Sequence, residues 1–306
     1  MPTSDYAPML ALPYEQVPPE DPRWNWDAQR KVDGIRAMVY LGPQGKRVLT
    51  RVKGKHTGEY GVKTEHLPWL PDTEKDYVFD GELLWGRNSK ECMKNLGCLP
   101  TESLKRQEAT HPVCFVAFDI LVGWGINLCP RPYFQRREAL LDHGSFVAMN
   151  LDHKFQILKH FTDARSAWER AKSLEWEGII LKESFGTYEP GRRSPNWVKV
   201  KRAKKYVAVV TGQLAGKEGK TGQMLGRMGS LMLGMWNGKM LVPVGNCGTG
   251  FDMDERGPSS WPVHLVVEVE SSDITEDGKL WHPRFIRRRP ELDLRAASVE
   301  QIHEPA

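Results

Sequence analysis

The sequence predicts two domains of different class: an α+β domain with antiparallel sheets and flanking helices, followed by a small β-barrel. Three observations lead to this prediction. At 306 residues the chain exceeds the usual size of one domain. Up to residue 203, short apolar strands alternate with helical segments, and from residue 204 onward only short strands with glycine-rich turns follow. We therefore expect domains at residues 1–203 and 204–306.

Composition narrows the class of protein. The net charge of +4 is too small to indicate a polyanionic partner by itself, so the local basic clusters matter more. The five cysteines contain no Cys-x-x-Cys pair and are odd in number, which favours a reduced, intracellular setting. No secretory leader is recognisable, and no apolar run approaches the roughly 20 residues that span a bilayer. We expect a cytoplasmic protein of a bacterial cell or phage-infected host, without a membrane partner.

The N-terminal residues 1–22 contain six prolines, which predict an extended segment along the surface. It shows no residues that indicate chemistry. Trp24 and Trp26 alternate with polar residues and predict a strand with one buried face.

The stretch from Arg30 to Arg36 is the first that points to chemistry. Lys31 lies just before a strand-like run and can be held there as a nucleophile. Gly34 allows a close backbone approach, and the guanidinium of Arg36 suits phosphate oxygens. Asp33 is expected to orient the loop. Taken alone, Lys-x-Asp-Gly is also the pattern of an exposed β-turn.

A hairpin is predicted next, from strands at 35–41 and 48–51 joined by Gly42-Pro43-Gln44-Gly45. Residues 53–76 predict a loop with a short helix. Residues 87–110 are polar and predict helix or loop.

Two apolar strands then carry acids in their interior. Asp80 and Glu82 flank a glycine within 77–85, and Asp119 follows Phe118 within 113–121. Because an unpaired buried carboxylate is costly, these acids need a partner, a metal or a ligand hydroxyl. A hairpin turn at Asp80-Gly81 is the alternative.

The middle of the chain predicts helices at 133–143, stopped by Gly144, and at 163–175 with Thr162 or Asp163 as cap. Glu177 and Lys182 then bracket a short apolar strand. Their side chains point to opposite faces, so they do not form a simple ion pair.

A basic surface loop at 183–196 leads into a strand at 197–201. Alternation places Val198 and Val200 on one face, with Lys199 and Lys201 on the other. Adjacent lysines repel each other unless an anion lies between them, although a solvated edge strand has the same pattern.

The C-terminal strands are expected at 206–211, 229–236, 239–244 and 263–270, a size and spacing that fit a five-stranded barrel of the oligonucleotide-binding type. Residues 281–290 carry four arginines interleaved with aromatics. This favours contact with polyphosphate or nucleic acid over a solvated basic tail.

These signals occur in a fixed order: Lys31 to Arg36, Asp80 to Glu82, Phe118-Asp119, Glu177-Gly178, and Lys199 with Lys201. In this order, with a C-terminal barrel, the chain resembles the ATP-dependent DNA ligases of the compact bacteriophage or bacterial type, members of the covalent nucleotidyltransferase superfamily. The resemblance covers residues 25–290. It implies an adenylation domain followed by an OB-fold domain.

The resemblance implies three chemical steps. Lys31 attacks the α-phosphate of ATP and forms lysyl-AMP, AMP moves to the 5′-phosphate of a nick, and the 3′-hydroxyl displaces it. Such a lysine needs nearby positive charge, from Lys199, Lys201 and a divalent cation, to favour its neutral form.

Further roles follow from the same resemblance. Magnesium, for which manganese can substitute, would be held by Glu177 with Glu82. The partner would be nicked double-stranded DNA, bound by a monomer. The expected residues are, for catalysis, Lys31, Lys199 and Lys201; for the nucleotide, these three with Arg36, Arg51, Glu82, Phe118 and Glu177; and for DNA, Arg36, Arg51, Arg192, Arg193, Arg284 and Arg287.

The last motif of the family matches only loosely, because Arg289-Pro290-Glu291-Leu292 stands where arginine-x-aspartate-lysine is expected. The arginine that orients pyrophosphate is therefore not identified. An RNA ligase or an mRNA-capping guanylyltransferase of the same superfamily is the nearest alternative, and a non-catalytic nucleic-acid-binding protein is a third.

Overall fold

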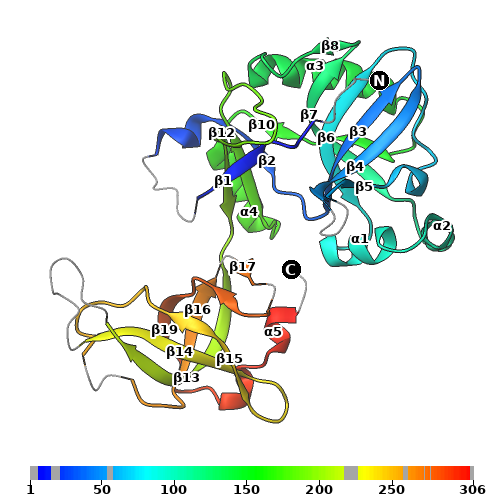
Figure 1. Ribbon diagram of the computed structural model, residues 1–306. Coiled ribbons are helices and arrows are strands. Elements are labelled where there is room, and N and C mark those ends of the chain that lie inside the picture. The colour runs from blue at the N-terminus through cyan, green and yellow to red at the C-terminus, as the bar shows by residue number, and fades with distance from the viewer. Residues whose placement is uncertain are drawn as a thin grey trace. The chain divides into compact units, whose positions relative to one another are not determined.

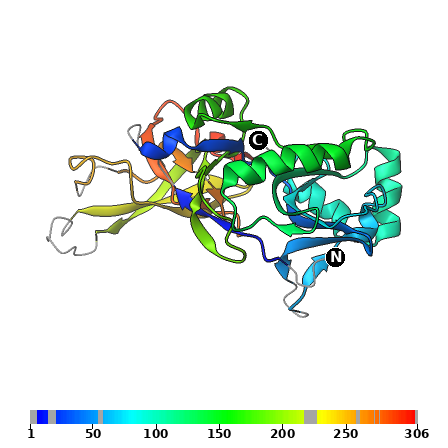
Figure 2. The same cartoon turned by 90° about the horizontal axis from the view of Figure 1, so that it is seen from above.

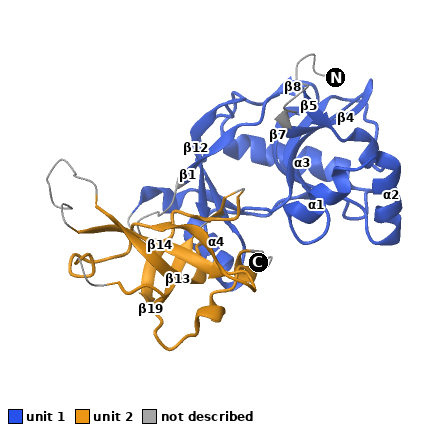
Figure 3. Ribbon diagram, turned by 60° about the horizontal axis from the view of Figure 1, so that its bottom comes forward, with its two compact units in different colours: residues 1–201, 306 blue, residues 202–305 orange. Residues whose placement is uncertain are grey.

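The computed structural model describes residues 6–14, 21–53, 58–216, 227–257, 261–271, 273–275 and 277–303. The chain divides into two compact units, residues 1–201 and residues 202–305 (Figure 3). All five cysteines are free thiols. In the ranges given above, no helix is long and apolar enough to cross a membrane.

Two β-sheets form the centre of the first unit (Figure 1). The larger has the order β5-β4-β3-β6-β7-β8, with β9 paired to β7 in parallel. Neighbours in the main path are antiparallel, and the predicted hairpin is confirmed as β3 and β4. The strands are β3 Ile35–Gly42, β4 Gly45–Lys53, β5 Tyr60–Val62, β6 Tyr77–Leu84, β7 Cys114–Gly123, β8 Ile126–Asn127 and β9 Phe155–Ile157.

The smaller sheet has the order β1-β12-β11-β2-β10. Only its edge strand β1 is parallel to its neighbour. The strands are β1 Leu10–Tyr14, β2 Asp27–Arg30, β10 His160–Phe161, β11 Gly178–Lys182 and β12 Arg193–Lys201.

The period of two along each strand produces a layered core. In β3, Ala37 and Val39 pack toward helices α1 and α3, whereas Met38 and Tyr40 pack toward residues of the smaller sheet. Helix α4 covers the other face of that sheet, and Figure 2 shows α3 lying along the larger one. The helices are α1 Ser89–Leu96, α2 Pro100–Ala109, α3 Tyr133–Ala148 and α4 Ala164–Ser173, with 3₁₀ turns at Pro22–Asn25 and Thr64–His66.

The N-terminal segment is more deeply integrated than the sequence suggested. Its described part contains β1, and Met9 is completely buried against Tyr40 and Tyr188. The expectation of a surface segment is therefore wrong at Met9. The prolines are tolerated because β1 is an edge strand. Residues 1–5 and 15–20 of the same expectation lie outside the described residues.

Two further expectations are corrected. Trp24 lies in a 3₁₀ turn, not a strand, because Asp21 caps this turn and Pro22 begins it. Helix α3 continues through Gly144, where a Cβ would lie 3.0 Å from the Cδ1 atom of Ile157. Glycine costs a helix only about 1 kcal/mol, and here it allows close packing against the next strand.

The second unit is built on an antiparallel sheet of order β15-β14-β13-β16-β19. Thr249, just after β15, forms a parallel bridge with Arg284 of β19, so the two edge strands are linked. Segment 281–290 is not a solvated tail, because most of it forms β18 and β19. The elements are β13 Lys204–Ala215, β14 Met228–Trp236, β15 Leu241–Cys247, β16 Val266–Ser271, β17 Asp273–Ile274, β18 Leu280–Trp281, β19 Arg284–Arg288, a 3₁₀ turn Leu294–Ala296 and α5 Glu300–His303.

A buried ion pair connects α3 to the larger sheet. Arg136 donates two hydrogen bonds of 2.9 Å to the carboxylate of Asp119, and neither side chain has exposed surface. Substitution Arg136→Leu would leave that carboxylate uncompensated. We expect the free energy of unfolding to fall by about 3–5 kcal/mol in urea titrations.

Arg87→Leu is the matched control, because Arg87 is highly exposed and forms a surface ion pair with Glu91. Its loss should cost less than about 0.5 kcal/mol. Equal losses in the two variants would contradict the structural role given to the buried pair.

Candidate active site

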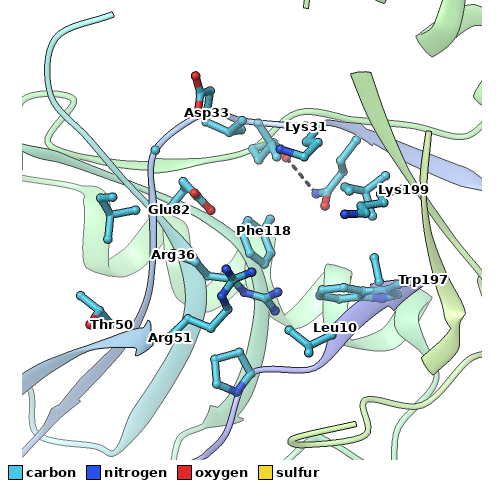
Figure 4. A pocket seen from close by; sticks show the side chains of 18 of the residues that line it. Leu10, Lys31, Asp33, Arg36, Thr50, Arg51, Glu82, Phe118, Trp197 and Lys199 are labelled. Atoms are coloured by element: carbon cyan, nitrogen blue, oxygen red, sulfur yellow. Dashed lines mark hydrogen bonds between the residues drawn. The ribbon is translucent and has the colours of Figure 1, made fainter. Parts of the chain in front are cut away.

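A pocket of about 1000 Å³ lies in the first unit and is lined by residues of both sheets (Figure 4). The N-terminal strand, the loop after β2 and the inner faces of β3, β6, β7, β11 and β12 all contribute to it. Of the residues singled out from the sequence, its lining contains Lys31, Arg36, Arg51, Glu82, Phe118, Arg193, Lys199 and Lys201.

Glu177 brings two of these lysines together. Lys31 Nζ donates a short hydrogen bond to Glu177 Oε2, and Lys201 Nζ lies 3.2 Å from Glu177 Oε1. The backbone N–H of Lys31 also donates to the Gly178 carbonyl at 2.9 Å, which continues the pairing of β2 with β11. These three side chains retain 17–29% of their exposure. The carboxylate is thus held between two ammonium groups that solvent can reach.

Glycines permit this close arrangement. A Cβ at Gly178 would lie 2.1 Å from the Val200 carbonyl oxygen, and one at Gly34 would lie 2.3 Å from the Leu83 carbonyl oxygen. The expected close backbone approach at Gly34 is confirmed. Asp33 is exposed beside it at the pocket (Figure 4).

Arg36 is anchored by a buried carboxylate. Its Nε and Nη2 donate to Asp80 Oδ1 and Oδ2 at 3.0 and 2.6 Å. Burial disfavours its charge, but Asp80, with smaller contributions from Tyr188 and Glu82, outweighs burial and raises the pKa of Arg36. Asp80 is not in a turn, because it lies in the middle of β6 opposite Met38. The partner expected for this strand acid is therefore an arginine of the neighbouring strand.

An aromatic wall stands beside Arg36. The guanidinium lies 5.2 Å from the ring centre of Phe118 and 5.5 Å from that of Trp197. The two rings meet edge to face at 6.0 Å. A face of this composition can accept a flat, electron-rich ring by stacking.

Lys182 lies behind these rings and was not among the predicted site residues. Its Nζ donates to the Phe118 carbonyl at 2.8 Å and lies 4.1 Å from the centre of the Trp197 ring. Burial lowers the pKa of Lys182 to about 7, although Asp119 opposes this shift. The only signal in the sequence was a lysine ending an apolar strand, and as expected it does not pair with Glu177.

Glu82, the other carboxylate that the sequence analysis assigned to the site, lines the pocket. Burial raises the pKa of Glu82 to about 7, and the Asp80 carboxylate adds to the shift. The positive charges of Arg36 and Lys31 oppose it. Glu82 therefore changes charge near neutral pH.

The other basic residues are more dispersed. Lys199 lines the pocket, Arg51 is exposed in its lining, and Arg193 Nη1 donates to the Ala11 carbonyl at 2.5 Å. Arg192 is exposed and is not part of the lining. In the second unit, Arg284 pairs with Glu270 at 3.0 Å and Arg287 with Glu268 at 2.9 Å.

A metal site is incomplete in the protein alone. In the part of the chain that the structure describes, no group of three or more His, Cys, Asp or Glu side chains could hold a metal ion. Magnesium, however, commonly takes one or two carboxylates and completes its shell with phosphate oxygens and water. Glu177, partly exposed to solvent at the lysine cluster, fits that limited contribution.

Comparison with known proteins tests the family resemblance that was inferred from the sequence. A family model described as the ATP dependent DNA ligase domain matches residues 8–201. This confirms the resemblance inferred from the order of motifs. The multifunctional non-homologous end joining protein LigD of Mycolicibacterium smegmatis is 28% identical over 317 residues, which cover 94% of this chain and 39% of that protein. The chain thus spans about two fifths of that relative.

Two other matches extend over most of both chains. DNA ligase C of Mycobacterium tuberculosis is 25% identical over 364 residues, covering 98% of this chain and 94% of that protein. A solved structure from a structure-function analysis of Lig E DNA ligases has a TM-score of 0.53 at 23% identity, covering 92% of this chain and 99% of that chain. The structural likeness shows a shared fold.

The shift at Glu82 predicts a pH dependence of stability. The pKa of Glu82 rises from its ordinary 4.5 to about 7 on folding, so ionisation is disfavoured in the folded state. The penalty is absent below about pH 4.5 and complete above about pH 7. Glu82→Gln, which mimics the neutral acid, should therefore gain stability relative to the wild type as pH rises through this window.

Urea titrations of both proteins between about pH 5 and pH 8 measure this difference. Glu102→Gln, an exposed glutamate on α2, serves as the control. A difference between Glu82→Gln and the wild type that does not change with pH would contradict the shift.

Proposed function

Because this chain belongs to the ATP dependent DNA ligase domain family, we propose that it seals nicks in double-stranded DNA with ATP, acting as a monomer. The observation that carries the proposal is the cluster of Lys31, Glu177 and Lys201 in the lining of, or directly beside, a pocket with an aromatic wall. It supplies a nucleophile, positive charge for a triphosphate, and a stacking surface for a base.

In the first step, the Lys31 amine attacks the α-phosphorus of ATP, the bond to the β-phosphate oxygen breaks, and pyrophosphate leaves. Lys199 and Lys201 neutralise the phosphate charge that develops. Glu177 orients Lys31 until the nucleotide binds, because its carboxylate accepts a hydrogen bond from Lys31 Nζ.

Three residues would hold the nucleoside. Phe118 would stack on the adenine, Glu82 would accept hydrogen bonds from the ribose hydroxyls, and Arg36 would contact the ribose or phosphate. A stacked base contributes about 1–3 kcal/mol to binding. The fixed guanidinium of Arg36 adds specificity because its orientation is already set by Asp80.

Magnesium would be held by Glu177, with Glu82 nearby, together with oxygens of the triphosphate, and manganese could take its place. The ion would supply charge neutralisation and polarise the phosphate.

The later steps use the same groups on DNA. AMP passes from Lys31 to the 5′-phosphate of the nick, and attack by the 3′-hydroxyl then forms the phosphodiester and releases AMP. Positioning and charge neutralisation carry most of such in-line transfers. Arg51, Arg192 and Arg193 would contact the DNA backbone near the pocket.

The second unit would be an OB-fold domain that closes on the nucleotide and then on DNA, with Arg284 and Arg287 among its DNA contacts. The strand order and the parallel bridge between its edge strands support an OB-fold. Both arginines remain more than half exposed although each pairs with a glutamate.

Covalent labelling tests the nucleophile. After incubation with labelled ATP and magnesium, we expect AMP on Lys31 in the wild type and complete loss of label in Lys31→Ala. Lys172→Ala removes an exposed lysine of α4 and should label fully. Label retained by Lys31→Ala, or an adduct formed with GTP alone, would contradict the proposal. Joining assays on nicked DNA and nicked RNA then decide the substrate.

Substitution of Arg192 tests whether this residue contacts DNA. Arg192→Ala should weaken binding to nicked DNA equally across sequences and reduce the slope of log affinity against log salt by about one. Labelling with ATP should not change, because Arg192 lies outside the pocket lining. Arg170→Ala, an exposed arginine on α4, is the control. An unchanged salt slope in Arg192→Ala would remove this residue from the interface.

A further inference from the structure

Hydrogen bonds join the N-terminal segment to the pocket. The backbone N–H of Met9 donates to Tyr188 Oη at 2.9 Å, and Tyr188 O–H donates to Asp80 Oδ2 at 2.6 Å. That same oxygen accepts a hydrogen bond from Arg36 Nη2 at 2.6 Å. Met9, Asp80 and Tyr188 are buried, so water cannot readily replace a lost member.

Tyr188 is fixed in one orientation. Its ring meets Trp197 edge to face at 5.6 Å, and the Arg136 guanidinium lies 5.7 Å from its centre. Burial and the charge of Asp80 raise the pKa of Tyr188 well above its usual value. The hydroxyl therefore keeps its proton, which points to Asp80, while its lone pair accepts from Met9.

Asp80 depends on this hydroxyl to hold Arg36. The carboxylate has no exposed surface and receives three hydrogen bonds, two from Arg36 and one from Tyr188. Without Tyr188 Oη, one oxygen loses a donor that nothing from solvent replaces. The carboxylate and the guanidinium bound to it can then rotate together, away from the faces of Phe118 and Trp197.

The N-terminal segment around Met9 also contributes to the pocket. Ala7, Pro8, Leu10 and Ala11 are part of the lining. The N–H of Leu10 donates to the Arg192 carbonyl, and the N–H of Gly191 donates to the Ala7 carbonyl, at 2.8 and 2.9 Å. Docking of this segment therefore completes one wall and, through Met9, contacts the hydroxyl that orients Asp80.

We propose that Tyr188, whose hydroxyl accepts the N–H of Met9, is a positioning residue for nucleotide binding that sets the orientation of Arg36 through Asp80. The proposal rests on the proposed function only in assigning Arg36 to the nucleotide. Tyr188 touches no substrate itself. It acts through Arg36.

Substitution Tyr188→Phe removes the hydroxyl and keeps the ring. Tyr40→Phe is a matched control, because Tyr40 is also buried and its Oη accepts the N–H of Tyr6, in the same N-terminal segment, at 2.8 Å. Both variants should lower the melting temperature by a few degrees. Only Tyr188→Phe should raise the ATP concentration that gives half the maximal rate of lysyl-adenylate formation, by about tenfold, with the maximal single-turnover rate constant changed less than about twofold.

A second measurement is independent of activity. Nitrogen-15 NMR of arginine-labelled protein detects the Arg36 Nε–H, assigned by its absence in Arg36→Lys. Because this N–H donates to Asp80, its exchange with solvent should be at least about tenfold faster in Tyr188→Phe and unchanged in Tyr40→Phe.

The outcomes separate the two proposals. Equal half-saturating ATP concentrations in Tyr188→Phe and Tyr40→Phe, or equal Arg36 Nε–H exchange, would overturn the role of Tyr188 in orienting Arg36. Absence of any adduct in the wild type would instead overturn the proposed function. In that case the exchange measurement still decides whether Tyr188 orients Arg36.

Discussion

Two carboxylates without exposed surface, Asp80 and Asp119, lie directly opposite each other on the paired strands β6 and β7. Like charges in such cross-strand positions destabilise a sheet, and burial adds a desolvation cost. Each carboxylate has its own arginine, Arg36 for Asp80 and Arg136 for Asp119. The rest of the pocket is arranged around these two compensated charges.

The buried charges explain the state of Lys182. Two carboxylates and two guanidinium groups already balance, so an ammonium group at Lys182 would leave the buried cluster with an excess positive charge. Its position 3.9 Å from Asp119 only partly offsets burial, which lowers the pKa of Lys182 to about 7. Three aromatic rings within 5.1 Å stabilise the charged form that remains. Lys182 also holds Phe118 in place, because its Nζ donates a hydrogen bond to the Phe118 carbonyl.

Local patterns in the sequence predicted the parts of this arrangement that depend on neighbouring residues. Alternation placed Val198 and Val200 opposite the two lysines of β12, and the buried side is confirmed for both valines. The acid within the strand 77–85 required a partner, and Asp80 has one. The partner's identity was not predictable, because Arg36 reaches Asp80 only through the register of β3 with β6.

Long-range contacts account for what the sequence did not reveal. Lys31 and Glu177 are 146 residues apart and meet because β2 pairs with β11. The sequence of the N-terminal segment shows prolines but not the tyrosine hydroxyl, 179 residues away, that binds Met9. The 3₁₀ turn at Trp24 and the continuation of α3 past Gly144 likewise depend on a cap and on packing that periodicity does not encode.

The site thus combines buried ion pairs, which hold their geometry, with a partly exposed cluster of charges, whose partners can change. Asp80 and Asp119 are fully buried, so their arginine partners cannot be replaced by solvent or ligand without a large cost. Lys31, Glu177 and Lys201 keep part of their exposure, and their ion pairs are correspondingly weak. Under the proposed function, a bound triphosphate would replace Glu177 as the partner of the two lysines, and a cation would bind the freed glutamate, while Phe118 and Trp197 beside Arg36 keep their geometry. The ion pairs that would have to break in the proposed reaction are those that water can reach. The ion pairs that fix the orientation of the arginines have carboxylates that water cannot reach.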